Sequence, residues 1–207
     1  MKTITVYSAS ELKEHDSDAF EKAHEEYKES CYETGLNWGG EIIDSLKAVF
    51  EHSSINLKDY SIDSNGHSWV KFDIESDNWG EDSSDWAQDM TGARAQAWLE
   101  NNLFYNLRET RPFSKRVKYY SNKAYNFTNY GQMESCPFTG VCFDEDFLES
   151  LQKDIKAGES LYDAYSNLAR VASKLFAGEW EAQLSEESFV DHADCNEWQY
   201  TEDGTRV

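Results

Sequence analysis

The sequence has little of what usually separates one domain from the next. Its 207 residues include only two prolines, Pro112 and Pro137, and no stretch rich in glycine and serine. Because linkers between domains are commonly rich in these residues, no boundary is marked along the chain. We therefore expect one compact domain over residues 1–207. The alternative is two subdomains, an α+β part (1–110) and a mainly helical part (111–207).

Long apolar runs and regularly spaced cysteines are also missing. No segment approaches the ~20 apolar residues that cross a bilayer. The opening residues MKTITVYSAS hold one lysine and no apolar core, unlike a secretory signal. The four cysteines (Cys31, Cys136, Cys142 and Cys195) are irregularly spaced in a chain large enough to fold without disulfides, so reduced thiols are expected. These absences predict a cytoplasmic protein with no membrane partner.

Recognisable catalytic motifs are absent from the sequence. It contains no HExxH helix, no phosphate-binding glycine loop, no serine nucleophile motif and no Cys-His dyad, so we expect neither an enzyme nor a bound cofactor. Four soft side chains (Cys136, Cys142, His192 and Cys195) are the candidate zinc ligands. Five residues separate the first pair, where two to four are usual. We therefore expect structural thiols here, with zinc as the alternative.

Positive charge is scarce in this chain. Lysine and arginine number 19 against 40 aspartates and glutamates, which leaves a net charge of −21. Such a charge repels itself and keeps a protein away from nucleic acid and anionic lipid. One explanation is solubility, and the other is a partner whose basic groove normally holds DNA or RNA. Hydrophobic residues at 39% and aromatic residues at 14% indicate a folded core in either case.

The acidic residues gather in three segments of the sequence. Duplex DNA carries about one charge per 1.7 Å of its axis, and clustered carboxylates on a folded surface can imitate part of that spacing. The alternative is a solvated surface with acids at helix N-termini, which residues 144–146 fit well. A calcium or magnesium site within 77–89 is disfavoured, because the segment lacks the alternation and glycine of a calcium loop. The candidate partner-binding residues are Asp73, Glu75, Asp77, Glu81, Asp82, Asp85, Asp89, Asp144, Glu145, Asp146, Glu149, Glu186, Glu187, Asp191, Asp194 and Glu197.

The segment 108–130 runs against the acidic trend. Its first part is basic and its second part is aromatic: Arg108, Arg111, Lys115, Arg116, Lys118 and Lys123 overlap with Tyr119, Tyr120, Tyr125, Phe127 and Tyr130. Basic residues beside aromatic rings are typical of single-stranded nucleic-acid sites. The alternative, favoured by the overall charge, is that the segment neutralises acidic clusters within the fold or across a homodimer.

The pattern of apolar residues predicts an α+β fold. Helical spacing indicates helices over 18–32, 40–52, 93–107, 143–157, 161–184 and 186–195, and short strands are expected at 3–7 and 198–200. Asn65-Gly66 lies between two β-prone runs, 56–62 and 68–74, and favours a tight hairpin because both residues tolerate positive φ. Within the second run Val70, Phe72 and Ile74 alternate with polar positions, so one face of the hairpin should pack on helices. We expect a small antiparallel sheet against several helices and a helical C-terminal half.

Several segments resemble a loosely defined group of phage and prophage accessory proteins. They are TVYSASEL, GEIIDSLKAVFEH, KDYSI, ARAQAWLENNL, CPFTGVCFDEDFL and CNEWQYTEDG, which together extend over most of the chain. Some members of the group carry antitoxin or antirestriction labels. The resemblance implies a small accessory protein of a phage, made in the bacterial cytoplasm, and it implies no functional residue.

Charge and resemblance together favour a binding function. We expect an inhibitor of a host nucleic-acid-targeting defence complex (CRISPR or restriction), acting as an acidic DNA mimic in the basic groove of that complex and binding no nucleic acid itself. One alternative is an antitoxin-like partner of a basic toxin. The other is a nucleic-acid-binding or metal-dependent protein that uses residues 108–130.

Overall fold

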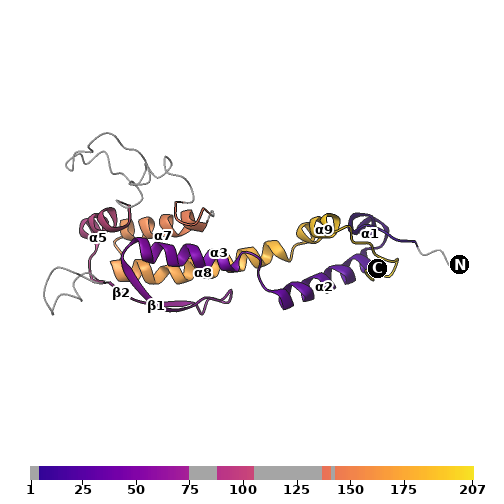
Figure 1. The fold of residues 1–207 in the computed structure, drawn as a ribbon, viewed down its shortest axis with the longest axis horizontal. Helices are drawn as coiled ribbons and strands as arrows, with labels where there is room; N and C mark the ends of the chain where they lie inside the picture. The colour runs from indigo at the N-terminus through magenta and orange to yellow at the C-terminus, as the bar shows by residue number, and fades with distance from the viewer. Residues whose placement is uncertain (1–4, 75–87, 105–136, 141–142) are drawn as a thin grey trace, which may run out of the picture. The chain divides into compact units, whose positions relative to one another are not determined.

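The chain forms two compact units in the computed structural model, which describes residues 5–74, 88–104, 137–140 and 143–207 (Figure 1). Unit 1 combines Met1–Gly39 with Ala177–Val207, and unit 2 is the intervening Gly40–Phe176. These units do not coincide with the subdomains 1–110 and 111–207, because unit 1 joins the two ends of the chain.

The fold class predicted from the sequence is confirmed. The described residues form seven α-helices, one π-helical turn and a two-stranded antiparallel sheet, and helices make up the C-terminal half. The elements are α1 (Ala9–His15), α2 (Ser17–Thr34), α3 (Gly39–His52), β1 (Ile55–Ser61), β2 (Trp69–Ile74), α5 (Gly92–Leu99), η1 (Glu100–Phe104), α7 (Phe143–Ala157), α8 (Leu161–Gln183) and α9 (Glu186–Cys195). None of the helices in this part of the chain has a stretch long and apolar enough to span a bilayer.

The hairpin of unit 2 has the predicted alternation. β1 and β2 pair from Ile55 opposite Ile74 to Ser61 opposite Trp69. Val70, Phe72 and Ile74 are buried, and the ring of Phe72 lies 5.3 Å from that of Phe50 on α3, centroid to centroid. The buried face of the hairpin therefore packs on the helices, as the sequence predicted.

The turn of the hairpin differs from the expected tight Asn-Gly turn. Seven residues, 62–68, separate the paired Ser61 and Trp69, and only Gly66 of the Asn-Gly pair has a positive φ, of 84°. The carboxylate of Asp63 accepts hydrogen bonds from the backbone N–H groups of Asn65 and His67, at 2.8 and 3.2 Å. A side chain thus satisfies the backbone of a wider loop, which a two-residue signal does not reveal.

Helices α3, α7 and α8 bury the centre of unit 2. Tyr165 on α8 is fully buried, and its hydroxyl donates to the Ser53 hydroxyl at 2.5 Å. Ser53 donates in turn to the carbonyl oxygen of Val49 at 2.6 Å. The buried hydroxyl groups of Tyr165 and Ser53 therefore both have a hydrogen-bond partner. Burial raises the pKa of Tyr165, which keeps the phenol neutral at all ordinary pH values.

A ring cluster forms the core of unit 1. Phe189 on α9 lies within 5.3–5.4 Å, centroid to centroid, of Phe20, His24 and Tyr27 on α2. It also meets Tyr200 edge-on at 6.0 Å. Nε2 of His24 lies 2.8 Å from the carbonyl oxygen of Leu184. The Tyr27 hydroxyl donates to the backbone carbonyl oxygen of Gln183 at 3.1 Å. These contacts join α2 to the C-terminal segment.

Short elements of unit 1 depart from the sequence prediction. Helix α1 was not predicted; it is capped by reciprocal hydrogen bonds between Ser8 and Glu11 and buries only Ala9 and Leu12. In place of strands at 3–7 and 198–200, a single bridge joins Tyr7 to Tyr200, and residues 1–4 lie outside the described residues. The predicted helix 93–107 is observed as α5 followed by the π-helical η1, which lies at the edge of the described segment.

The C-terminal residues close tightly on helix α2. Gly204 has a φ of 79°, and a Cβ atom added there would lie 2.2 Å from the backbone oxygen of Ala19. Since a real Cβ never approaches a backbone oxygen so closely, only glycine fits this contact.

We predict that Gly204→Ala destabilises unit 1 by about 3 kcal/mol, from strain of the left-handed backbone and from the clash. Gly66→Ala is the matched control: its φ is also positive, but nothing lies within 4 Å of the added atom. Gly66→Ala should lower the free energy of unfolding by only about 1 kcal/mol. Urea unfolding followed by circular dichroism measures both, and equal losses would show that the contact with Ala19 is not tight.

Candidate partner-binding surface

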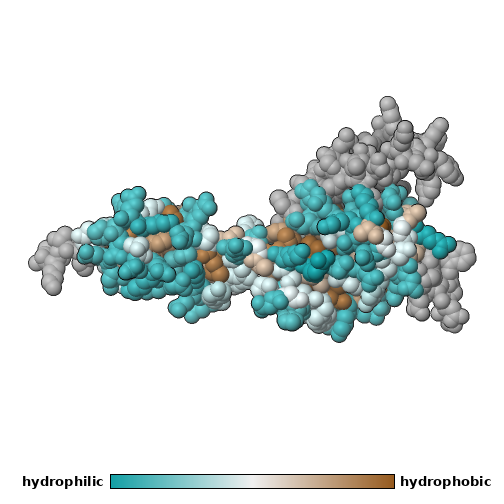
Figure 2. All heavy atoms as spheres, turned by 180° about the vertical axis from the view of Figure 1, so that it is seen from behind, coloured by the Kyte–Doolittle hydropathy of each residue, from teal (hydrophilic) through white to brown (hydrophobic). Residues whose placement is uncertain are grey.

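The net charge is concentrated in unit 1. Its 70 residues hold 18 acidic and five basic side chains, a net charge of −13, whereas unit 2 has 22 acidic and 14 basic side chains, a net charge of −8. Per residue, the charge of unit 1 is about three times that of unit 2. Hydrophilic residues cover much of the face of unit 1 seen in Figure 2. Unit 1 is therefore the more acidic part of the molecule.

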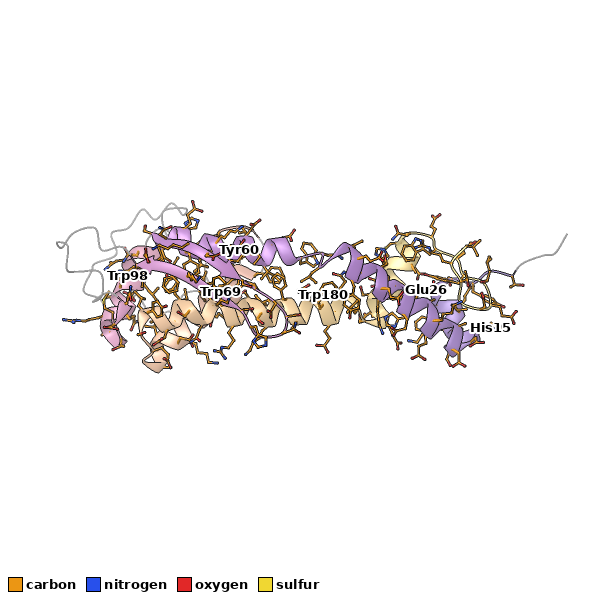
Figure 3. The ribbon with its side chains drawn as sticks, turned by 90° about the horizontal axis from the view of Figure 1, so that it is seen from below. His15, Glu26, Tyr60, Trp69, Trp98 and Trp180 are labelled. Carbon is orange, nitrogen blue, oxygen red and sulfur yellow. The ribbon has the colours of Figure 1, made fainter. Side chains whose placement is uncertain are left out.

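Helix α2 positions the largest group of these acids. The carboxylate of Asp16 caps its first turn by accepting from the N–H groups of Asp18 and Ala19. The apolar side of the helix is buried in the ring cluster around Phe189, which leaves the acids on the exposed side. The exposed acids are Asp18, Glu21, Glu25, Glu26, Glu29 and Glu33; Figure 3 labels Glu26 among them.

The spacing of the α2 acids approaches that of a nucleic-acid strand. From Asp18 to Glu33 the helix rises about 22 Å, so its six acids provide roughly one charge per 4 Å. One DNA strand carries one charge per about 3.4 Å of axis. The α2 acids are not all on one line, but their linear density is comparable with that of phosphates.

Few of the unit 1 acids are neutralised. Lys13 bonds Glu186 at 2.5 Å, Lys28 bonds Glu25 at 2.7 Å, and Lys22 lies 3.8 Å from Asp203. His15 lies 3.8 Å from Glu202. Among the described residues, the remaining 14 acids of unit 1 make no ion pair. Every lysine described in unit 1 is thus engaged, and most carboxylates are not.

Hydrogen bonds and charge explain the pKa shifts in unit 1. The hydrogen bond from Lys28 lowers the pKa of Glu25, and the one from Lys13 lowers the pKa of Glu186. The Thr201 hydroxyl, which donates to Asp203, lowers the pKa of that carboxyl. These three acids therefore stay ionised to lower pH than usual, and the stability that each contributes is lost as the pH falls through its folded-state pKa.

Helix α9 places most of the predicted C-terminal acids on its exposed side. Glu187, Asp191 and Asp194 are spaced four and three residues apart, which sets them on one face of the helix. They are exposed, as are Glu186, which is paired with Lys13, and Glu197, which follows the helix. The structure therefore brings this predicted group onto the same unit as the α2 acids.

Asp144, predicted as a partner-binding residue, is instead a buried structural group of unit 2. Its side chain is 0% exposed. The carboxylate accepts hydrogen bonds from the N–H groups of Phe138 and Thr139, both at 2.8 Å, and from the Thr139 hydroxyl at 3.0 Å. Asp144 is therefore unavailable to a partner, because its carboxylate is used to hold residues 138–139 against the start of α7.

The neighbouring acids of α7 remain accessible. Asp146 and Glu149 are exposed and Glu145 is partly exposed. Burial raises the pKa of Asp146, and the charges of Glu149 and Glu145 raise it further. A carboxyl whose pKa is raised by folding stabilises the folded state only at pH below its unfolded pKa, and this contribution disappears as the pH rises through the folded value. At neutral pH the charge of Asp146 therefore opposes folding.

A groove of about 670 Å³ lies beside these acids, between α7 and α8 of unit 2. Its charged lining is mixed: Asp146, Glu149 and Asp154 with Lys153, Lys156, Arg170 and Lys174. Three acids and four bases nearly cancel, so the groove does not attract one sign of charge strongly. It is a weaker candidate site than the acidic surface of unit 1.

The remaining predicted residues belong to unit 2 or lie outside the described residues. Asp73 on β2 pairs with Lys58 across the hairpin, and Asp89 is exposed before α5. Glu75, Asp77, Glu81, Asp82 and Asp85 lie outside the described residues, as does the basic-aromatic segment from 108 to 130. The described residues therefore include only part of the predicted interface, which stays a prediction.

The zinc alternative is also only partly placed. Cys136 and Cys142 lie outside the described residues. His192 packs its ring against Trp198 at 4.9 Å, and Cys195 is exposed with a free thiol. No group of three or more histidine, cysteine or acidic side chains suited to a metal occurs within the described part of the chain.

Sequence reasoning missed the acids of α2, although it predicted the helix. Lys22 and Lys28 interrupt their run, so a search for segments free of basic residues passes over them. Helical periodicity would have identified them, because the acids lie on the side of the helix opposite the buried Phe20 and Tyr27.

Comparisons with known proteins add no family assignment. No protein-family model matches the chain, and neither the curated proteins nor the solved structures contain a match.

We predict that Asp144→Asn destabilises unit 2 by about 1–3 kcal/mol. The amide oxygen can still accept from the N–H groups of Phe138 and Thr139, but these hydrogen bonds lose the carboxylate charge, and the amide NH2 would face the Thr139 hydroxyl that now donates to the second carboxylate oxygen. Glu149→Gln, one turn further along the same helix and exposed, should change stability by less than about 0.5 kcal/mol. Thermal unfolding at neutral pH compares the two variants. Similar melting temperatures would contradict a structural role for Asp144.

Proposed function

We propose that this protein binds, through the acidic surface of unit 1, a cationic surface on another protein that normally holds a nucleic-acid backbone. Bound there, it excludes the nucleic acid by occupying the site and by neutralising its charge. No chemical step is involved. The observation that carries the proposal is the concentration of unpaired carboxylates on unit 1, centred on the exposed side of α2.

The placement of acids within the helices supports this proposal over a purely solvating role. Acids at a helix N-terminus stabilise the helix, but acids near its C-terminus oppose the helix dipole. Glu33 lies in the last turn of α2 and Glu181 in the last turn of α8, and neither turn contains a basic residue. These acids therefore weaken the helices that hold them, and solubility alone does not require that position.

The resemblance to phage and prophage accessory proteins favours a host defence complex as the partner, either a CRISPR or a restriction complex. The interaction is then between a protein of net charge −21 and a groove built for phosphates. Such complementarity makes association fast and sensitive to salt. An antitoxin-like role against a basic toxin uses the same surface and is distinguished by which partner is inhibited.

The test uses purified host restriction and CRISPR complexes and a labelled duplex that they bind. Addition of the protein should release the duplex, and the inhibition should weaken as salt rises from about 50 mM to 300 mM. The triple variant Glu21→Gln, Glu26→Gln and Glu29→Gln removes three exposed acids of α2 that make no ion pair with a described residue. At about 0.5 kcal/mol for each charge, it should inhibit roughly tenfold less well.

The control variant removes the same charge from unit 2: Asp44→Asn, Glu51→Gln and Glu159→Gln, all exposed, with Asp44 paired to Lys47 at 3.7 Å. It should inhibit like the unchanged protein. The α2 variant should also unfold at an equal or higher temperature, since it relieves repulsion within unit 1. If both variants inhibit equally less well, inhibition depends on the total charge of the protein rather than on the acidic surface of unit 1. Inhibition that does not change with salt concentration would indicate an apolar interface instead.

A further inference from the structure

An exposed aromatic pair lies within the acidic surface of unit 1. Tyr32 on α2 is 65% exposed, the most exposed large aromatic side chain among the described residues. Its ring lies 5.4 Å from that of Trp180, centroid to centroid, at an interplanar angle of 35°. Trp180, labelled in Figure 3, is partly buried and packs against the core of unit 1. The pair is thus held in place on one side and open to solvent on the other.

Three other described aromatic rings that are at least partly exposed have a cation or a ring against one face, whereas Trp38, 51% exposed, has neither. Lys71 lies over the ring of Trp69, 4.6 Å from its centroid, and the guanidinium of Arg206 lies over Trp198 at 4.3 Å. Tyr162 packs against Phe72 at 5.0 Å. No cation lies over Tyr32 or Trp180 among the described residues: the nearby Lys28 is bonded to Glu25. The pair therefore lacks the cation that lies over Trp69 and over Trp198.

Four acids lie near the pair in the sequence of the two helices, and two of them, Glu33 and Glu181, are the acids that oppose the helix dipoles. Glu29 lies one turn before Tyr32 on the same face of α2, and Glu33 follows it directly. Glu179 and Glu181 flank Trp180 near the end of α8. All four lie within unit 1 and make no ion pair with a described residue. An exposed ring with carboxylates on the same helices is a combination that suits one side chain above others.

That side chain is arginine. Its guanidinium is planar, accepts stacking on an aromatic face and donates paired hydrogen bonds to a carboxylate, whereas the compact ammonium of lysine does not stack in this way. Trp, Tyr and Arg are also the residues that most often dominate binding energy at protein interfaces. A basic groove that holds phosphates commonly presents arginine for the same bidentate geometry.

We infer that the Tyr32–Trp180 pair, with the adjoining carboxylates, is the anchor of the unit 1 interface and binds arginine side chains of the partner protein. The inference rests on the proposed function, whose basic partner supplies the arginines, and adds which residues carry specificity. The α2 acids attract the partner at long range, and the aromatic pair selects arginine over lysine at contact.

The test compares two peptides of equal charge, nona-arginine and nona-lysine, by isothermal titration calorimetry at one fixed salt concentration. The unchanged protein should bind nona-arginine about two- to fivefold more tightly than nona-lysine, the gain of one exposed cation–π contact. Tyr32→Ala should remove this preference and leave binding of nona-lysine unchanged. Tyr32→Leu, which keeps apolar area without the aromatic face, should remove the preference as well.

The control is Trp69→Ala, which removes an exposed ring of unit 2 that Lys71 already covers; it should retain the preference. If Tyr32→Ala and Tyr32→Leu keep the preference for arginine, or if the unchanged protein shows none, the aromatic anchor is wrong while the acidic interface stands. If the protein binds neither peptide, the proposed function fails together with the inference. The α2 triple variant should bind both peptides more weakly by the same factor. This result separates attraction by charge from selection of arginine by the rings.

Discussion

Packing around Phe189 is the interaction on which unit 1 depends. This ring contacts Phe20, His24 and Tyr27 from α2 and Tyr200 from the C-terminal segment, so it joins parts of the chain that are far apart in sequence. Burial of each large apolar side chain contributes about 2 kcal/mol. Repulsion between carboxylates is weaker for each pair but acts among the 18 acids of the unit. A small unit of this charge is stable only because its core is aromatic and well packed.

Much of the fold could be predicted because its long elements carry clear periodicity. Helices α2, α3, α7, α8 and α9 begin and end within a few residues of the predicted bounds. The alternation of Val70 and Phe72 predicted the buried face of the hairpin. Helix α1 was missed because it has only seven residues and one large buried side chain, Leu12. The sequence does not show which segments make up unit 1, because the unit depends on contacts such as Tyr7 with Tyr200, which leave no local signal.

The candidate surface was only partly predictable for a related reason. Sequence shows where acids are numerous, and it found the group on α9. It does not show which acids are neutralised. Lys28 forms an ion pair with Glu25 and not with Glu29, although all three residues lie on one helix. Nor does it separate the buried carboxylate of Asp144, which accepts hydrogen bonds from residues 138–139, from the exposed Asp146 two residues later. Both distinctions arise from tertiary contacts rather than from composition.

The discontinuity of unit 1 has a consequence for the protein while it is being made. The whole of unit 2 is synthesised after α2 and before α9, so α2 emerges from the ribosome long before Phe189 is available to cover it. At about 5–20 residues per second, the interval is on the order of ten seconds. During this interval the apolar side of α2 is bare, and its carboxylates keep nascent chains apart. We therefore expect the same negative charge that destabilises the folded unit 1 to reduce aggregation of the nascent chain.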